Sequence, residues 1–425
     1  MYRSVMAPVL KVIRESPAVW LFILSYFCSV TVGFLLLELP FCKIHSVSSI
    51  DTLFTAASAV STTGLATVDI AKSFSSIGHF VVILLVQLGG IGYMVFSSFV
   101  ILSLEERVSS SQALSFVKGI LKQVLIYTAI CEIIGTILLY PLFKQTGVEN
   151  SLWQALFHSI SAFCTAGFSL FSSNLEAFKN GIGINIIISF LSLMGALGFF
   201  LSLDFFKKLS GSKEPIRFLP RLAKPFVTLV ILSAPLIFVW ISFTNFGFEN
   251  ITISFFHVIS AISTAGFNTI AMGALSKATL VFVIFLMLIG ASITGSGSNM
   301  KGTNFFALLR LVSSPSSWGQ KNLKKRAQIA FSTFTHYLIV LSFFSMLLIL
   351  IEKKPVFPLL FEAASALCTV GFSMGVTVEL SSLGKALLAL LMVVGRSGIL
   401  IFGFALSYQA LKIKGEPYVT KKEEA

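Results

Sequence analysis

The segment SAFCTAGFSLF, residues 161–171, places polar residues and a glycine inside a very apolar chain. Lipid cannot satisfy exposed backbone groups, so a glycine-broken polar segment among apolar runs must be buried or line water. Related phrases recur at regular intervals, each ending in Thr-x-Gly. They read FTAASAVSTTG (54–64), FHSISAFCTAG (157–167), FHVISAISTAG (256–266) and FEAASALCTVG (361–371). Four copies that keep Phe, Ser-Ala, Thr and Gly in register predict one structural unit repeated four times.

The composition predicts a membrane protein. The 425 residues are 56% hydrophobic and only 12% charged, with a mean hydropathy of +0.91, whereas a soluble domain carries about 25% charged residues. The apolar residues collect in runs of about 20, which is enough to cross a bilayer as a helix. The expected spans are 18–40, 77–103, 122–143, 181–206, 222–244, 278–293, 328–351 and 383–411.

The formal net charge of +13 has its explanation in membrane orientation. Lys and Arg are concentrated in alternate connecting segments, as the positive-inside rule requires, so both termini are expected in the cytoplasm and no nucleic acid is needed as a partner. The expected cytoplasmic segments are 1–17, 104–122, 207–224, 310–326 and 412–425.

Each repeated phrase stands between two expected spans and is too short to cross the membrane, so it predicts a re-entrant helix and loop. Two spans per unit return the chain to its starting side, so all four units share one orientation. The predicted fold class is an all-α polytopic membrane protein, with four tandem span–pore-helix–span repeats around one pseudo-tetrameric, potassium-channel-like pore. The predicted parts are a cytoplasmic N-terminus (1–17), repeats at 18–103, 119–206, 222–311 and 328–411, and a cytoplasmic tail (412–425).

Four like-oriented loops around an axis can present a ring of carbonyl oxygens that replaces the water shell of a cation. Glycine permits the backbone conformations that such a ring requires, and the negative C-terminal ends of the short helices would also favour a cation. The alternative is that glycine and Ser-Ala only allow close helix packing, as small residues do in membranes. Four copies in register favour the carbonyl ring.

The repeats resemble the pore repeat of the TrkH/TrkG/KtrB/HKT superfamily of potassium transporters, over about residues 18 to 411. The second helix of each repeat resembles its counterpart in that superfamily, and the short chain looks closer to KtrB than to TrkH. The segments concerned are QLGGIGYMVF (87–96), MGALGFFLSLDF (194–205), GASITGSGSNMKGTNFFALL (290–309) and MVVGRSGILIFGFAL (392–406). The resemblance implies potassium uptake through a selectivity filter, without enzymatic activity.

Carried over residue by residue, the resemblance implies a K⁺ filter in the four Thr-x-Gly segments. Its residues would be Thr62, Thr63, Gly64, Thr165, Ala166, Gly167, Thr264, Ala265, Gly266, Thr369, Val370 and Gly371. Members with glycine at all four filter positions resemble K⁺ conductors, whereas serine in the first repeat accompanies Na⁺ selectivity. Gly64 therefore favours K⁺, and a Na⁺-conducting or weakly selective transporter of the same fold stays as the alternative.

The resemblance also implies a gate in the broken helix 290–304, although Ile293 stands where the superfamily often has proline. Its candidate residues are Gly290, Gly295, Gly297, Lys301, Gly302 and Arg396. Lys301 either belongs to the gate or reaches the cytoplasmic interface. Arg396 lies inside an apolar run and should face the bundle interior, either as a barrier in the pore or paired with an acid such as Glu132. Glu132 itself is a structural partner or part of an ion path.

The remaining expectations concern partners and other classes of protein. The chain is expected to need no cofactor beyond the transported K⁺, to sit in lipid in a bacterial inner membrane, and, by resemblance, to form a homodimer with a cytosolic RCK-domain nucleotide-binding subunit. The even, parallel repeats count against an alternating-access transporter. No nucleophile with a paired base recurs, which counts against an enzyme. A metal site from His158 and His257 lacks further ligands.

Overall fold

A computed structural model describes residues 17–106, 113–198, 251–290 and 321–396 of the chain. Within these ranges the protein consists of helices joined by turns and short 3₁₀ segments, and no strand is present. One isolated antiparallel bridge pairs Lys43 with Phe74 in the described part. The observed class is therefore all-α, as the apolar runs predict.

The long helices carry the apolar runs of the sequence. They are α2 (Pro17–Glu38), α5 (Ser76–Glu106), α6 (Ala113–Gln145) and α14 (Lys321–Ile351). Two shorter apolar helices are α8 (Ile182–Leu197) and α12 (Lys277–Ile289), and a further helix is described from residue 382 to 396. Stretches of α5, α6 and α14 are each long and apolar enough to cross a membrane on their own among the described residues.

Four short helices lie where the repeated phrase stands in the sequence. They are α3 (Ser49–Val60), α7 (Ser151–Phe163), α11 (Ile251–Ser263) and α15 (Val356–Leu367), with twelve or thirteen residues each. Three of them end two residues before the threonine of Thr-x-Gly, and α11 ends directly before it. Their C-terminal halves are almost fully buried, so the small Ser-Ala pairs lie inside the protein.

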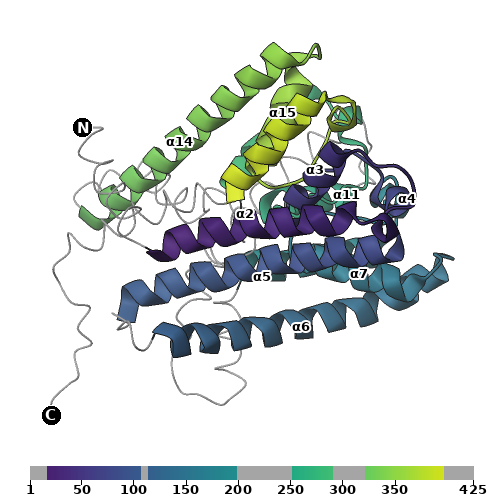
Figure 1. Cartoon of the computed structure of the whole chain (residues 1–425), viewed down its shortest axis with the longest axis horizontal. Coiled ribbons are helices and arrows are strands. Elements are labelled where there is room, and N and C mark those ends of the chain that lie inside the picture. The colour runs from purple at the N-terminus through teal and green to yellow at the C-terminus, as the bar shows by residue number, and fades with distance from the viewer. Residues whose placement is uncertain (1–16, 107–112, 199–250, 291–320, 397–425) are drawn as a thin grey trace.

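The long helices form a layer from which the short helices are offset toward one end. Figure 1 shows α2, α5 and α6 side by side, with α3, α4 and α7 toward one end of that layer. In the same view, α14 leans away at an angle and α15 lies between it and α3. The four short helices are thus gathered in one half of the molecule.

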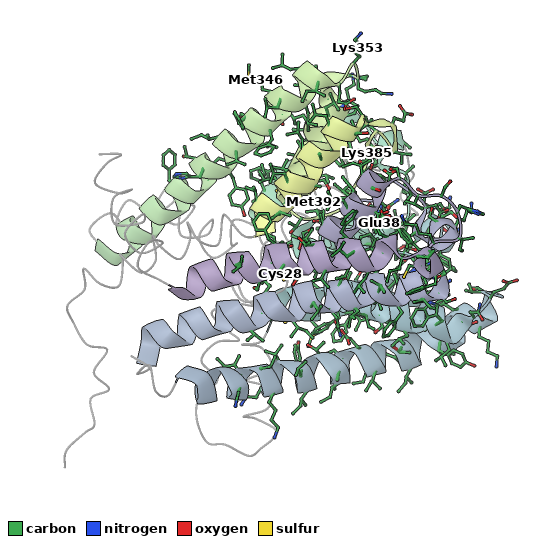
Figure 2. All side chains as sticks on the ribbon, viewed as in Figure 1. Cys28, Glu38, Met346, Lys353, Lys385 and Met392 are labelled. Carbon is green, nitrogen blue, oxygen red and sulfur yellow. The ribbon has the colours of Figure 1, made fainter. Side chains whose placement is uncertain are left out.

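The outer faces of the long helices are apolar and exposed. Ile137 on α6, Met346 on α14 and Leu350 near the end of α14 have exposed fractions of 64%, 63% and 71%. Figure 2 shows carbon-rich side chains along these faces, with Met346 labelled on α14, and Lys353 at the helix end. Apolar outer faces with charges at the ends are typical of helices that lie in lipid.

Two helices stop at a glycine. Gly198, which follows α8, has φ +72°, and Gly290, which follows α12, has φ +52°. Right-handed helix cannot continue through that conformation, so the helix predicted over 181–206 ends at Leu197. Gly290 opens the predicted gate segment, whose other residues lie outside the described ranges. The expected span 222–244 also lies outside them.

The second helices approach the short helices closely at glycines. A Cβ atom at Gly89, Gly195 or Gly395 would lie 2.0, 1.7 and 2.1 Å from a backbone carbonyl oxygen. These oxygens belong to Val60, Phe163 and Leu367, the last residues of α3, α7 and α15. Real Cβ atoms do not approach an oxygen so closely, so only glycine lets the two backbones meet there.

Replacing Gly89 with alanine should therefore separate α5 from the end of α3. We expect Gly89→Ala to destabilise the protein by about 1–3 kcal/mol, as overpacked sites do, measured as a lower midpoint of thermal unfolding in detergent. Gly92→Ala on the same helix is the control, because nothing lies within 4 Å of a Cβ there. Equal midpoints for the two variants would contradict the close approach.

A candidate ion site formed by four Thr-x-Gly segments

The threonine that ends each short helix adopts a left-handed backbone. Thr62, Thr165, Thr264 and Thr369 have φ values of +49°, +52°, +61° and +49°. A β-branched residue is rare in this region, and each such residue costs on the order of 1–3 kcal/mol when the surrounding structure enforces it. Strain of this kind at four matched positions is typical of a functional site.

Two backbone hydrogen bonds fix each threonine in this conformation. Its N–H donates to the alanine carbonyl of the Ser-Ala pair, and the next N–H donates to the serine carbonyl. In the second repeat these bonds join Thr165 to Ala162 at 3.0 Å and Ala166 to Ser161 at 2.8 Å, and all four repeats have the same pair. This is the Schellman helix end, which usually takes glycine where these helices have threonine. The position of the Ser-Ala pair therefore fixes the residue at which the chain leaves the helix, which is the threonine.

The four glycines then bring the segments into contact with one another. Gly64, Gly167, Gly266 and Gly371 also have positive φ, between +67° and +96°. A Cβ atom on each would lie 1.8 to 2.3 Å from a carbonyl oxygen of another repeat. The contacts run from Gly64 to Ala166, from Gly167 to Ala265, from Gly266 to Val370 and from Gly371 to Thr63. The sequence of contacts passes through repeats one, two, three and four and returns to the first, so the segments form a closed ring.

Several side-chain hydroxyl groups lie next to the ring, where the short helices end. The Thr62 and Thr264 hydroxyls are buried and have no hydrogen-bond partner within the part of the chain that the structure describes. In the first repeat the Ser61 and Thr63 hydroxyls bond each other at 2.7 Å. Buried hydroxyls normally have partners, so unpartnered ones beside a ring of carbonyls are available to a ligand.

The serine of the Ser-Ala pair bonds the glycine or the residue after it in three repeats. The Ser161 hydroxyl donates to the Phe168 carbonyl and the Ser260 hydroxyl to the Phe267 carbonyl, both at 2.8 Å. The Ser365 hydroxyl accepts the Gly371 N–H at 3.0 Å. The Ser58 hydroxyl of the first repeat has no partner among the described residues. The first repeat thus differs from the others in side-chain contacts although its backbone follows them.

A cluster of buried polar side chains connects α5, α6 and α7 next to the Thr-x-Gly segment of the second repeat. The Gln87 amide donates to Glu132 Oε2 at 2.6 Å, and the Cys164 thiol donates to Gln87 Oε1 at 2.8 Å. The Ser159 hydroxyl donates to the Glu132 backbone carbonyl at 2.8 Å. Cys164 directly precedes Thr165, so this group adjoins the ring and gives Glu132 a described structural partner.

Arg396 is fully buried at the junction of α5 with the helix 382–396, the last helix of the described residues. Its Nη2 donates to the Gly89 carbonyl at 3.2 Å, and its guanidinium lies 4.3 Å from the centre of the Tyr93 ring. Gly89 and Gly395 are the glycines that contact the ends of α3 and α15. The arginine therefore lies near the C-terminal ends of two short helices, whose partial negative charge favours a cation.

Most of the other predicted gate residues lie outside the residues that the structure describes. Gly290 is described as the end of α12, while Gly295, Gly297, Lys301 and Gly302 lie outside the described ranges. Among described residues, no group of three or more His, Cys, Asp or Glu side chains could hold a metal ion.

Comparison with known proteins identifies the class. The chain matches the TrkH family model, described as cation transport protein, over residues 25–407. It is 32% identical to Ktr system potassium uptake protein B of Bacillus subtilis (strain 168), over 93% of this chain and 94% of that protein. It is 28% identical to potassium/sodium uptake protein NtpJ of Enterococcus hirae, over 93% and 94%.

A solved structure extends the comparison to the fold. The crystal structure of the potassium transporter TrkH from Vibrio parahaemolyticus matches with a TM-score of 0.72 at 18% sequence identity, covering 91% of this chain and 83% of that one. The protein is thus a multi-pass helical membrane protein of a transport class. More particularly, it belongs to the TrkH family of cation transport proteins.

Several residues at the site carry no sequence signal as strong as Thr-x-Gly. The left-handed threonines were not predicted, because Thr at a helix end is ordinarily extended. The contacts of Gly89, Gly195 and Gly395 were not predicted either, although the glycine-rich segments that hold all three were singled out. Gln87 and Cys164 had no signal beyond being polar or small residues in apolar runs.

The buried group of Gln87 offers a direct test. We expect Gln87→Leu to destabilise the protein by about 1–3 kcal/mol, because Glu132 loses its amide donor inside the protein. Removing both polar partners should cost less, so Gln87→Leu combined with Glu132→Leu should recover part of the unfolding midpoint. A double variant that is less stable than the single one would contradict this pairing.

Proposed function

We propose that this chain takes up K⁺ across the cell membrane through a four-repeat selectivity filter formed by its Thr-x-Gly segments. The observation that carries the proposal is the closed ring in which each glycine abuts a carbonyl of the next repeat. Such a ring offers oxygen atoms in place of the water shell of a cation. Family membership and the name of the B. subtilis relative support K⁺ as the ion.

The environment of the ring favours cations over anions. The short helices α3, α7, α11 and α15 all end at the ring, so the negative ends of four helix dipoles lie together there. The segments are almost entirely buried, and charge interactions are stronger away from water. An ion that has lost its water shell would be stabilised by these dipoles and by the carbonyl oxygens.

A Na⁺-conducting or weakly selective transporter of the same fold is the second candidate. The E. hirae relative is named a potassium/sodium uptake protein, so its name mentions both ions. Glycine at all four ring positions favours K⁺ for this chain, because serine at the first position accompanies Na⁺ selectivity in the proteins that the repeats resemble.

We propose further that transport is gated below the filter by the 290–304 segment and Arg396. The support is the end of α12 at Gly290, where the chain leaves the helix, and the burial of Arg396 between the glycines that contact α3 and α15. A positive charge beside a cation path raises the barrier to the ion. Lys301 either takes part in this gate or reaches the cytoplasmic interface.

A cytosolic RCK-domain subunit and a second copy of the chain are the proposed protein partners. The basic segment 207–224 is the proposed docking region for the cytosolic subunit; it lies outside the described residues. The proposal draws on family resemblance and on the name of the B. subtilis relative, which places that protein in a Ktr system. Lipid is the expected surrounding, and the expected orientation has both termini in the cytoplasm of a bacterial inner membrane.

The filter proposal predicts the effect of a side chain at Gly64. We expect Gly64→Ser to reduce the preference for K⁺ over Na⁺ by about tenfold, or roughly 1.4 kcal/mol, since its Cβ would lie 2.1 Å from the Ala166 carbonyl oxygen. The measurement is cation uptake into liposomes, with Rb⁺ or K⁺ in competition with Na⁺. Gly92→Ser is the control. An unchanged ion preference in Gly64→Ser would remove Gly64 from the filter.

The gate proposal predicts faster transport when the charge of Arg396 is removed. We expect Arg396→Ala to raise the rate of K⁺ uptake several-fold in the same liposomes, because the barrier to a cation falls. Arg396→Lys keeps the positive charge and should stay close to the wild-type rate. If Arg396→Ala transports no faster while remaining folded, the arginine serves only to join the last helix to α5.

A further inference from the structure

One position of the repeated phrase contacts the chain beyond the ring. It directly follows the phenylalanine that starts each phrase, and its four occupants are Thr55, His158, His257 and Glu362. All four side chains are buried. Each lies nine residues before the ring glycine of its repeat, so these contacts are not required by the ring itself.

In the second and third repeats this position is a histidine that accepts a hydrogen bond. His158 Nδ1 bonds the Gln154 carbonyl at 2.8 Å and His257 Nδ1 bonds the Ile253 carbonyl at 2.8 Å. A carbonyl can only accept, so Nδ1 carries the hydrogen and the Nε2 of the neutral ring is an acceptor. Nε2 of His158 lies 2.9 Å from the Ser169 hydroxyl, and Nε2 of His257 accepts the Thr269 N–H at 3.3 Å.

In the fourth repeat the side chain of Glu362 makes the same kind of contact through more hydrogen bonds. Glu362 Oε1 accepts the Ser373 hydroxyl and the Met374 N–H, both at 2.8 Å, and Oε2 accepts the Thr377 hydroxyl at 2.6 Å. Each of these donors follows Gly371 in the chain. Three hydrogen bonds to one buried carboxyl group join α15 to the segment beyond its ring glycine.

The first repeat lacks this contact. The Thr55 hydroxyl donates to the Asp51 carbonyl of its own helix at 2.8 Å, which is the common local bond of a helical threonine. Together with the unpartnered Ser58 hydroxyl, this leaves the first repeat without the side-chain contacts that the other short helices make from these two positions to the ring glycine or the chain beyond it.

We propose that His158, His257 and Glu362 are positioning residues for ion selectivity, which we call the clamp residues. Each holds the segment beyond a ring glycine against its own short helix and so fixes the place of that quarter of the ring. Selectivity depends on the number and placement of the coordinating carbonyls, so it depends on the clamp residues although they need not touch the ion. The first repeat has no clamp residue at this position. This inference rests on the proposed function.

The test compares ion preference among matched variants of the full-length chain in liposomes. Glu362→Gln, His158→Phe and His257→Phe keep the shape of the side chain but lose an acceptor, and we expect each to lower the preference for Rb⁺ over Na⁺ by about tenfold. Thr55→Val changes the same position in the first repeat. His79→Phe removes a partly buried histidine that bonds the Ile70 carbonyl from α5 and not from a short helix. Both controls should keep the wild-type preference.

A purely structural role would give a different pattern. If clamp variants unfold at lower temperature but keep the wild-type ion preference, the inference is overturned; it is also overturned if Thr55→Val and His79→Phe lose preference equally. Should Glu362→Gln not fold, Ser373→Ala and Thr377→Val remove donors while Glu362 stays, and the same criterion applies. A wild-type protein without preference for Rb⁺ would overturn the proposed function and this inference with it, whereas unchanged clamp variants overturn this inference alone.

Discussion

The left-handed threonine at the end of each short helix is the constraint on which the rest of the structure depends. It turns the chain out of α3, α7, α11 and α15 after the same residue in each repeat, and the following glycine can then meet the next repeat. The strained backbone persists because two hydrogen bonds to the Ser-Ala pair hold it. This explains why Ser-Ala, Thr and Gly keep a fixed spacing in all four copies: the helix end and the ring are one unit.

Close backbone contact makes this arrangement possible inside a membrane protein. Lipid supplies no hydrophobic force between helices, so association relies on packing and on internal hydrogen bonds. Glycines on the second helices let α5, α8 and the last helix lie directly against the carbonyl ends of α3, α7 and α15. The ring is therefore held from one side by the long helices and from the other by contacts beyond the glycines. Around Gln87 and Glu132, buried polar groups satisfy one another.

Much of the fold could be predicted from the sequence, because apolar length and repetition depend on local residues. The apolar runs correspond to α2, α5, α6 and α14, and the repeated Thr-x-Gly motif indicates the class of protein. The end of α8 at Leu197 was not predicted, since the run continues apolar to residue 206 and only the conformation of Gly198 stops it. The ring contacts could not be derived from spacing alone, because they join residues of different repeats, including the first and the last, whose approach is set by four helices together. The same holds for Arg396, whose burial was expected but whose contact with Tyr93 depends on how the last helix meets α5.

The four repeats have the same backbone conformation but different side chains at some positions. These side chains can change during evolution more easily than the ring glycines can. A change at a ring glycine forces two backbones apart, whereas a change at the second position of a phrase leaves the helix end intact. Threonine, two histidines and a glutamate occupy that position, with no bond, one bond each and three bonds to the segment beyond the glycine. A single chain with four unequal quarters can therefore adjust the stiffness of one side of an ion path independently of the others. A channel assembled from four identical subunits has no such freedom, because any substitution appears in every quarter at once.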